Sequence, residues 1–305
     1  MMAPIALFVY RRPEHTRRAV EALKVNEESK HSPLFVFSDG AASPAYESAV
    51  REVRDYIHGI DGFASVTFVE RERNLGLADS IVAGVTQLCD EIGRVIVVED
   101  DLIVAPGFLD YMNTALDRYA DEERVMQIAG HMFPVDLSDV ESDAVFLPIT
   151  TSWGWGTWAR SWRHMKRGRE NHDWIVASRN RRHQFDANGS FPYLAMLQDN
   201  VEGKISSWAI EWYASVFRMQ GMTLFPVRTL VSNTGDERAT HASRPEFWAS
   251  QVDPDFRVRA FPPPEVDGRA MDLLQRYFLG SDRGRRSIRQ HMLHAFNRLT
   301  APIRT

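Results

Sequence analysis

Three consecutive acidic residues, Glu99, Asp100 and Asp101, directly follow the apolar run at residues 95–98. A run rich in β-branched residues is typical of a strand buried on both faces. Adjacent carboxylates repel one another and are costly to bury without a partner. A hard divalent cation such as Mg²⁺ or Mn²⁺ would remove this repulsion, because these ions prefer oxygen ligands. The alternative is an acidic junction between strand and loop that is simply solvated.

Other polar groups follow the earlier apolar segments. Arg11 and Arg12 follow the first segment, Asp39 and Gly40 the second, and Asn74 the third. Ligands bind beyond the carboxyl ends of parallel strands, so we expect these side chains to meet the acidic residues at one sheet edge. Arginine pairs with phosphate oxygens and an aspartate can accept a base N–H, which indicates a nucleoside diphosphate bound with a divalent cation. Taken singly, the Asp-Gly pair is also typical of a turn, and the arginine pair of an exposed helix entry.

The elements that must position these residues alternate between strands and helices. This alternation indicates right-handed βαβ units and an α/β protein with a mainly parallel sheet flanked by helices. No glycine-rich phosphate loop follows the first strand, which argues against P-loop and dinucleotide-binding proteins. Expected strands are residues 4–10, 33–38, 65–71, 94–98, 125–129, 144–148 and 222–227, and expected helices begin near Pro13, lie within 43–58 and 75–91, begin at Pro106 and span about 207–219.

The second half of the chain carries an alternation of tryptophan and glycine. Trp153, Trp155 and Trp158 stand in the motif SWGWGTW at residues 152–158. Glycine allows a mobile backbone and indoles present flat faces, so the segment predicts a platform for an acceptor or donor sugar. The alternative is a core turn in which glycine only permits close packing. Residues 164–190, rich in charged and amide side chains, predict a surface insertion.

Glu211 is a single carboxylate within an otherwise apolar and aromatic helix. Its helical neighbours one turn away on either side are Ser207 and Ser215, which leaves one narrow polar face. A carboxylate on such a face could open onto a cleft and act as a general base. The alternative is an exposed glutamate on an amphipathic helix. His241 follows later in a polar loop, where a lone histidine is usually a surface residue.

Composition limits the class of protein. The 305 residues, 44% of them hydrophobic, suffice for a full core in one large or two small domains. A net charge of −5 gives no sign of nucleic-acid binding. Cys89 is the single cysteine, which fits a reducing compartment. Because the start lacks the basic region of a signal peptide and no apolar run could span a bilayer, we expect a cytoplasmic protein.

Taken in order, several motifs resemble those of glycosyltransferases with the GT-A fold. The chain is similar to bacterial sugar transferases that distantly resemble animal N-acetylglucosaminyltransferases. The resemblance implies a Rossmann-like, mainly parallel sheet, and sugar transfer with inversion from a nucleotide donor, usually UDP-linked, with Mn²⁺ or Mg²⁺. The motifs are VYRRPEHT (9–16), FSDG (37–40), RNLGLADSIVAGV (73–85), VIVVEDD (95–101), SWGWGTW (152–158), ISSWAIEWYASV (205–216) and TH (240–241).

The resemblance also implies roles around the acidic motif. Asp101 would be the direct metal ligand, Asp100 would contact the ribose, and Glu99 would lie near the donor sugar. His241 would complete the metal site. Glu211 would be the general base that activates the acceptor hydroxyl.

The remaining donor-side roles follow in the same way. Arg12 would contact the donor and Asp39 the uracil, with Asn74 in the neighbouring loop. The resemblance leads us to expect a small polar residue where this chain has Arg11. Which of the two arginines faces the diphosphate is therefore left open.

These observations together predict an enzyme, an inverting glycosyltransferase that moves a sugar from a nucleotide donor to a hydroxyl of a glycan or lipid-linked acceptor. The expected divisions are a nucleotide-sugar-binding half at residues 1–125, an acceptor-binding and catalytic half at 126–262, and a basic helical tail at 263–305. A sugar nucleotidylyltransferase would need a glycine-rich loop with a lysine after the first strand. A non-catalytic nucleotide-sugar or carbohydrate-binding module is the other alternative, which retention of Asp101 and Glu211 disfavours.

The end of the expected tail has a charge pattern of its own. Residues 283–304 include many arginines and no acidic residue. Apolar residues fall on one side of a helix through this stretch, which favours weak peripheral contact with an anionic membrane. A helix that docks on the protein itself or on a partner protein is the alternative.

Overall fold

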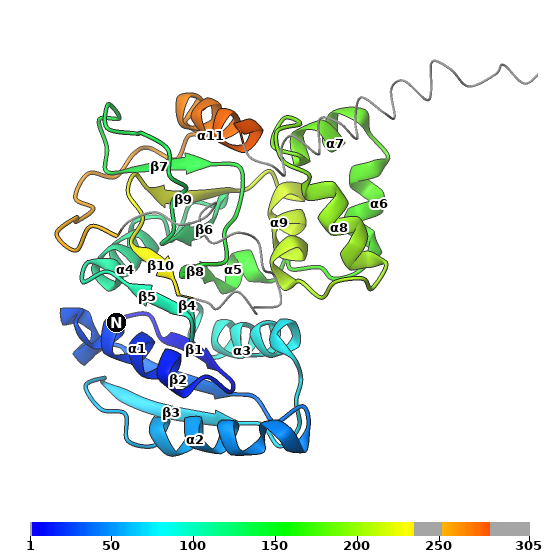
Figure 1. Cartoon of the computed structure of the whole chain (residues 1–305). Helices are drawn as coiled ribbons and strands as arrows, with labels where there is room; N and C mark the ends of the chain where they lie inside the picture. The colour runs from blue at the N-terminus through cyan, green and yellow to red at the C-terminus, as the bar shows by residue number, and fades with distance from the viewer. Residues whose placement is uncertain (1, 235–251, 281–305) are drawn as a thin grey trace, which may run out of the picture.

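The computed structural model describes residues 2–234 and 252–280. Within these ranges the chain builds an eight-stranded sheet and a separate two-stranded sheet (Figure 1). The strands of the large sheet are β1 (Ile5–Val9), β2 (Pro33–Ser38), β3 (Ser65–Glu70), β4 (Arg94–Glu99), β6 (Val125–Ala129), β7 (Ala144–Leu147), β8 (Trp155–Trp158) and β9 (Met222–Pro226). The small sheet pairs β5 (Leu102–Val104) with β10 (Val231–Asn233).

The order of strands in the large sheet is β3-β2-β1-β4-β8-β6-β9-β7. The first four strands along the chain are parallel, as the sequence predicts, and β6 is parallel to β9. β8 runs antiparallel between β4 and β6, and β7 runs antiparallel beside β9. The expected α/β class with a mainly parallel, Rossmann-like sheet is confirmed.

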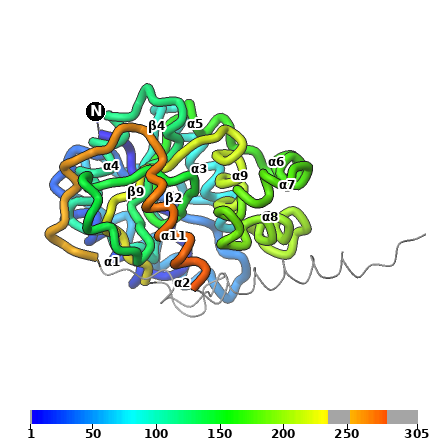
Figure 2. Tube along the Cα trace, turned by 90° about the horizontal axis from the view of Figure 1, so that it is seen from above, coloured from blue at the N-terminus to red at the C-terminus, as the bar shows by residue number. Residues whose placement is uncertain are grey.

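Helices cover both faces of the large sheet (Figure 1). They are α1 (Pro13–Lys24), α2 (Glu47–Ile57), α3 (Leu77–Ile92), α4 (Phe108–Arg118), α5 (Ala159–Trp162), α6 (Arg169–Val176), α7 (Arg179–Phe185), α8 (Tyr193–Val201), α9 (Trp208–Arg218) and α11 (Gly268–Gly280). α1, α2 and α4 share one hydrophobic cluster with the sheet, and α3, α5 and α9 share another on the opposite face. α6, α7 and α8 gather at one side of the molecule (Figure 2).

Alternation along β4 explains how the two faces are built. Val95 and Val97 belong to the cluster that α3 and α9 cover, while the residues between and after them belong to the opposite cluster. α3 approaches the sheet closely because Gly84 has no side chain, and a Cβ there would lie 2.8 Å from Cζ of Phe8. The same alternation places Glu99, at the end of β4, on the face of α3 and α9.

The tryptophan–glycine segment forms the interior strand β8 rather than a mobile loop. Trp155 is fully buried, and Trp158 is only 5% exposed. Gly154 has a φ of +61°, and a Cβ there would lie 2.8 Å from Cγ2 of Val231, so glycine serves close packing. The prediction that Trp155 and Trp158 form a sugar platform is wrong, because their indoles fill the core on the two faces of the sheet. Trp153 is partly exposed and stays a candidate.

Residues 164–190 do not form the expected surface insertion. They build α6 and α7, and buried side chains such as Ile175 and Phe185 join α8, α9 and α11 in a third hydrophobic cluster. The ring of Phe185 stacks on Tyr213 of α9 with centroids 4.6 Å apart. The composition was misleading because short helices with narrow apolar stripes carry many charged residues on their outer faces.

The two predicted halves of the chain share one sheet, since β8 lies between β4 and β6. α11 packs on the second half through Ala270, Leu274 and Phe278. The divisions at residues 125 and 262 stay predictions. The expected basic end of the chain, residues 281–305, lies outside the described residues. Among the helices that are described, none is long and apolar enough to cross a membrane.

Candidate active site

A cluster of carboxylates lies at the carboxyl end of β4, beside the residues that follow β1. Nη2 of Arg12 donates to Oδ1 of Asp100, and Nε of Arg12 lies 3.4 Å from Oδ2 of the same residue. Nη1 of Arg12 donates to Oδ2 of Asp101 at 3.2 Å. The sheet brings these residues together, because the N–H of Asp100 donates to the carbonyl oxygen of Phe8 at 3.1 Å. We call Glu99, Asp100, Asp101 and Arg12 the carboxylate cluster.

The carboxylate cluster holds more negative than positive charge. Burial raises the pKa of Asp100 to about 6, although Arg12 opposes the shift. Burial, together with the neighbouring Asp101 and Asp100, raises the pKa of Glu99 well above its usual value. Among the described residues, the side chain of Glu99 has neither a hydrogen-bond nor an ion-pair partner. Three carboxylates around one guanidinium would be stabilised by a further cation.

The charge excess and the oxygen donors fit a divalent cation. Within residues 2–234 and 252–280, no group of three His, Cys, Asp or Glu side chains is arranged to hold a metal ion. Mg²⁺ sites often need only one or two carboxylates, because substrate phosphates and water complete the coordination. The residues present therefore suit a metal that is bound jointly with the donor, with Asp101 as its predicted ligand. His241, the second predicted ligand, lies outside the described residues.

Asp39 holds the loop that precedes α3. Its Oδ1 accepts hydrogen bonds from the N–H groups of Gly40 at 3.0 Å and Leu75 at 2.9 Å. Its Oδ2 accepts from the N–H of Gly76 at 2.9 Å. The side-chain amide of Asn74 donates to Oδ2 of Asp39 at 3.0 Å and to the carbonyl oxygen of Gly40 at 2.8 Å. We call these residues the Asp39 cradle.

The Asp39 cradle uses the side chains that the sequence assigns to the donor nucleotide. Both carboxylate oxygens of Asp39 and the amide of Asn74 are bonded to their own chain. Gly40 is required for this close approach, since a Cβ there would lie 2.6 Å from the carbonyl carbon of Arg73. The structure thus brings Asp39 and Asn74 together as supports for the start of α3. Their contact with a donor stays a prediction.

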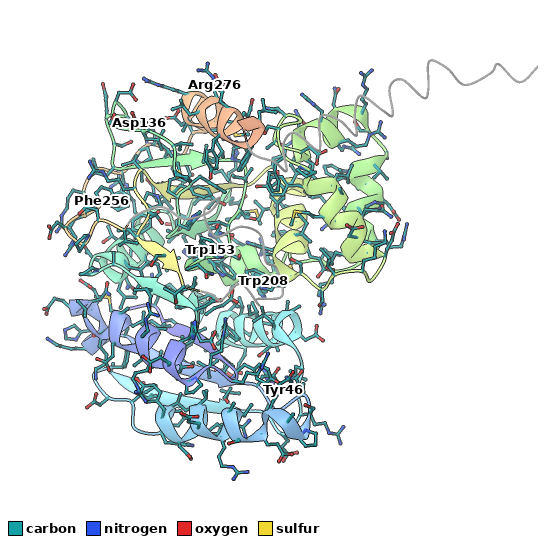
Figure 3. The ribbon with its side chains drawn as sticks, in the orientation of Figure 1. Tyr46, Asp136, Trp153, Trp208, Phe256 and Arg276 are labelled. Carbon is teal, nitrogen blue, oxygen red and sulfur yellow. The ribbon has the colours of Figure 1, made fainter. Side chains whose placement is uncertain are left out.

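The two arginines after β1 have different surroundings. Arg12 binds the carboxylate cluster, whereas Arg11 is exposed and its guanidinium lies 4.2 Å from the centre of the Tyr46 ring. Tyr46 directly precedes α2 and lies at the periphery of the molecule (Figure 3). Arg12 is therefore the arginine joined to the acidic motif, and which of the two arginines faces the diphosphate stays a prediction.

Glu211 lies on α9 with a side chain that is only 6% exposed. Its Oε2 accepts from Nε of Arg167 at 2.9 Å, and its Oε1 accepts from the N–H of Gly168 at 3.0 Å. Nη1 of Arg167 donates to Oδ1 of Asp79, in the first turn of α3, at 2.6 Å. We call Asp79, Arg167, Gly168 and Glu211 the Glu211 clamp. Neither surrounding expected from the sequence, an open polar face or an exposed surface, is found.

Packing places the Glu211 clamp on the same face of the sheet as Glu99. Trp208 lies at the start of α9 (Figure 3). Its ring stacks on that of Trp155 with centroids 5.0 Å apart. Trp155 lies on β8, the strand directly beside β4. At the other end of the clamp, Asp79 lies in the first turn of α3, which directly follows the cradle. The clamp therefore lies on the face of the sheet that α3 and α9 cover, with Asp79 directly after the Asp39 cradle.

β10 returns the chain to the acidic motif. Thr234 donates from its N–H and its hydroxyl to the carbonyl oxygen of Asp101, at 2.8 Å and 3.1 Å. Nε2 of His15 lies 3.2 Å from the carbonyl oxygen of Thr234. These contacts connect α1 and β10 to the backbone of the predicted metal ligand, which holds Asp101 in place independently of its side chain.

Sequence reasoning does not find Arg167, Asp79 or Arg54. Arg167 lies in the charged stretch expected at the surface, and its carboxylate partners are 44 and 88 residues away along the chain. The sequence shows only that a glycine follows Arg167; its φ of +87°, just before α6, is visible in the structure alone. Arg54 connects α2 to the sheet by donating from Nη2 to the carbonyl oxygen of Arg71 at 2.7 Å.

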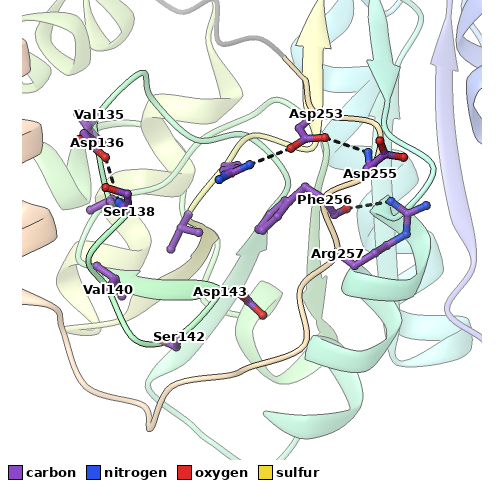
Figure 4. A pocket seen from close by; sticks show the side chains of 13 residues that line it. Val135, Asp136, Ser138, Val140, Ser142, Asp143, Asp253, Asp255, Phe256 and Arg257 are labelled. Carbon is purple, nitrogen blue, oxygen red and sulfur yellow. Dashed lines mark hydrogen bonds and ion pairs between the residues drawn. The ribbon is translucent and has the colours of Figure 1, made fainter.

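A polar cavity of about 680 Å³ lies apart from these groups, between residues 135–143 and 253–257 (Figure 4). Its carboxylates are engaged by neighbouring loops. Oδ2 of Asp253 accepts from Arg228 at 2.8 Å, and Oδ2 of Asp143 accepts from two backbone N–H groups at 2.8 Å each. None of the described residues that the sequence assigns to the site lines this cavity. We therefore place the candidate active site at the carboxylate cluster.

Several solved structures resemble the chain in fold. Mannosyltransferase PcManGT from Pyrobaculum calidifontis, in complex with GDP-Man and Mn²⁺, is 12% identical, covers 99% of this chain and 76% of its own, and has a TM-score of 0.48. GalNAc-T7 with UDP, GalNAc and Mn²⁺ is 10% identical, covers 80% of this chain and 46% of its own, and has a TM-score of 0.51. TarS from S. aureus is 13% identical, covers 78% of this chain and 37% of its own, and has a TM-score of 0.42.

The similarity to GalNAc-T7 shows a shared GT-A fold and confirms the fold that the sequence motifs predict. At 10% identity this similarity concerns the fold alone. The chain spans 46% of the length of GalNAc-T7 and 37% of that of TarS. No protein-family model matches the chain, and no curated protein matches it.

Proposed function

We propose that the protein is a metal-dependent, inverting glycosyltransferase that moves a hexose or N-acetylhexosamine from a UDP-linked donor to a hydroxyl of a glycan or lipid-linked acceptor. The observation that carries this proposal is the carboxylate cluster, whose excess negative charge lies at the carboxyl end of β4. The fold supports it, because GalNAc-T7, which shares the GT-A fold, was solved with UDP, GalNAc and Mn²⁺.

On the donor side, Asp101 would hold Mn²⁺ or Mg²⁺. The cation, when bound, supplies positive charge for the diphosphate that leaves as the sugar–phosphate bond breaks. In this proposal Asp100 contacts the ribose and Glu99 the donor sugar, and the ion pairs of Arg12 keep both aspartates in place. His241, outside the described residues, is the further proposed ligand.

On the acceptor side, Glu211 would remove the proton of the acceptor hydroxyl. The hydroxyl oxygen attacks the anomeric carbon from the face opposite the leaving diphosphate, which inverts the configuration. A carboxylate offers about four acceptor positions, and Glu211 uses two of them for Arg167 and Gly168. The capacity that remains can accept the hydroxyl of the acceptor. Trp153, which is partly exposed, is proposed to contact the acceptor.

Thermal unfolding with a panel of nucleotide sugars tests this proposal. A ligand that binds only the folded state raises Tm, with a stabilisation of about 2.7 kcal/mol at a concentration 100 times its Kd. We expect UDP-linked sugars to raise Tm in Mn²⁺ but not in EDTA, and the protein to transfer or hydrolyse the sugar that binds. The proposal fails if UDP-, GDP-, ADP- and CMP-linked sugars all give no metal-dependent shift and no turnover.

The proposed setting is polysaccharide biosynthesis at the cytoplasmic face of a membrane, where a lipid-linked acceptor would be met. Residues 283–304, outside the described residues, would supply weak electrostatic contact with anionic lipid. Flotation with anionic vesicles compares the full chain with a chain that ends at Ser281. We expect only the full chain to float, and only at low salt. Equal flotation of the two chains contradicts this role.

A further inference from the structure

The guanidinium of Arg167 joins two helices, α3 and α9. α3 directly follows the loop at residues 74–76, which we call the donor-side loop, and α9 carries the proposed base Glu211. Arg167 donates from Nη1 to Asp79 on α3 at 2.6 Å and from Nε to Glu211 on α9 at 2.9 Å. Its chain neighbour Gly168 donates to the other oxygen of Glu211 at 3.0 Å. α3 and α9 also contact each other directly. Arg167 therefore connects α3, which directly follows the Asp39 cradle, to α9, which carries Glu211.

These donors fix the direction of the Glu211 carboxylate. Because consecutive residues bind its two oxygens, rotation about its last bond would break at least one hydrogen bond. The side chain is 6% exposed, so water offers little replacement. A base that a third group orients is a recurring feature of catalytic sites. Such orientation matters because a displacement of about 1 Å can cost ~100-fold in rate.

Asp79 holds Arg167 from the opposite end. Hydrogen bonds to Asp79 and to Glu211 raise the pKa of Arg167, so the guanidinium stays charged. The Arg167 side chain is 44% exposed, and without Asp79 it would be held at one end only. Asp79 itself lies in the first turn of α3, directly after the loop that the Asp39 cradle holds. The contacts of Arg167 with Glu211 and Asp79 thus fix the position of the Glu211 carboxylate relative to the donor-side loop.

We propose that Arg167 is a positioning residue that holds the Glu211 carboxylate in the direction from which it takes the proton of the acceptor hydroxyl. This inference rests on the proposed function, in which Glu211 is the base. Arg167 touches no reacting atom, so its loss acts on turnover and not on donor binding. The competing explanation is an ion pair that adds only stability.

Two variants of Arg167 separate the effect of directed hydrogen bonds to Glu211 from the effect of a positive charge beside it. Arg167→Lys keeps a positive charge beside Glu211, but an ammonium cannot place two directed N–H groups on Glu211 and Asp79 in the same way. Arg167→Met removes the charge and keeps an unbranched side chain. Lys166→Met is the matched control, because Lys166 precedes Arg167 and its ion pair with Glu170 is exposed, at 55% and 52%.

The experiment measures kcat, donor KM and Tm for each variant of the full chain. We expect Arg167→Lys and Arg167→Met to lower kcat by about tenfold or more with donor KM unchanged. Lys166→Met should behave as the wild type. In a Glu211→Gln background, Arg167→Met should lower kcat no further, because the group that Arg167 positions no longer takes a proton.

Full turnover in Arg167→Lys would overturn the inference, because charge alone would then suffice. An equal loss of kcat from Arg167→Met with and without Glu211→Gln would also overturn it. If the wild type transfers sugar and Glu211→Gln does so equally well, the inference fails while the proposed function stands. If the wild type neither turns over a nucleotide sugar nor binds one with metal, the proposed function fails and the inference fails with it.

Discussion

The carboxylate cluster and the Glu211 clamp both place carboxylates around a guanidinium, with opposite results. In the cluster, Arg12 bonds Asp100 and Asp101, and the side chain of Glu99 has no hydrogen-bond or ion-pair partner among the described residues. In the clamp, Arg167 bonds one oxygen of Asp79 and one of Glu211, and a backbone N–H bonds the second oxygen of Glu211. The cluster holds more negative than positive charge, whereas the buried carboxylate of the clamp has both oxygens bonded.

This difference indicates what each region can do. Neighbouring carboxylates whose negative charge is not neutralised by basic side chains must shift their pKa or bind a cation. In the cluster, burial has raised the pKa of Asp100 to about 6. A carboxylate held by two donors is fixed in direction, yet it retains lone pairs for a proton. We therefore propose that the cluster recruits metal and donor and that the clamp takes the proton of the acceptor.

The largest expected effect comes from removing the packing between the two regions. Trp155 is fully buried and stacks on Trp208 of α9. Trp155→Ala should therefore lower the free energy of unfolding by about 3–5 kcal/mol, measured by urea denaturation. Trp153→Ala, at a partly exposed position, is the control and should cost much less. A stable Trp155→Ala protein with only a raised acceptor KM would instead restore the sugar-platform interpretation.

Glu211→Gln tests the proton-transfer side of the comparison. Glutamine keeps the shape of the side chain but takes no proton, so turnover should fall by roughly 100-fold or more. Calorimetric titration with the donor and Mn²⁺ should still give the affinity of the wild type. If donor affinity falls by the same factor as turnover, Glu211 supports the donor side and the proposed division of roles is wrong.

The Asp39→Asn variant tests whether Asp39 supports the loop that precedes α3 or contacts the base of the donor nucleotide. An amide N–H would then face the backbone N–H groups of Leu75 and Gly76, so the free energy of unfolding should fall by about 1–3 kcal/mol. UDP and GDP affinities should decrease by similar factors, because the loop and not a base contact is disturbed. A selective loss of UDP affinity with an unchanged Tm would show that Asp39 reads the base.

The smallest expected effect belongs to Arg11. This residue is exposed and stacks on Tyr46, so Arg11→Ala should change the free energy of unfolding by no more than about 0.5 kcal/mol. Arg12→Ala should cost about 1–3 kcal/mol, because it leaves the buried Asp100 without its charged donor. Thermal unfolding of the two variants measures the difference. Equal losses would show that the two arginines are not distinguished as the structure indicates.

The fold was predictable where apolar runs are continuous. Residues 33–38 and 125–129 coincide with β2 and β6, because a buried strand is visible in its composition. β8 was not predictable, since its four residues form a strand only between β4 and β6, which are distant in the chain. The pairing of β5 with β10 depends in the same way on partners far apart in sequence.

The candidate site was predictable in part. The meeting of Arg12 with Asp100 and Asp101 follows from the rule that parallel strands present their carboxyl ends at one edge. The internal use of Asp39 was not visible, because it depends on the conformation of a loop 35 to 37 residues further along the chain. The contact between Arg167 and Glu211 was not predictable, because the two residues are 44 positions apart and their contact depends on how α9 packs beside α3.

Calorimetric titration of UDP tests most directly whether the carboxylate cluster binds the donor through a cation held by Asp101. Three proteins are each titrated with Mn²⁺ and with EDTA: the wild type, Asp101→Asn and Asp110→Asn. Asp110→Asn is the control, because Asp110 lies on α4 and its carboxylate pairs with Arg259. We predict that the wild type and Asp110→Asn bind UDP only with Mn²⁺, and that Asp101→Asn keeps its Tm but shows no Mn²⁺-dependent binding. Undiminished Mn²⁺-dependent UDP affinity in Asp101→Asn would contradict the account.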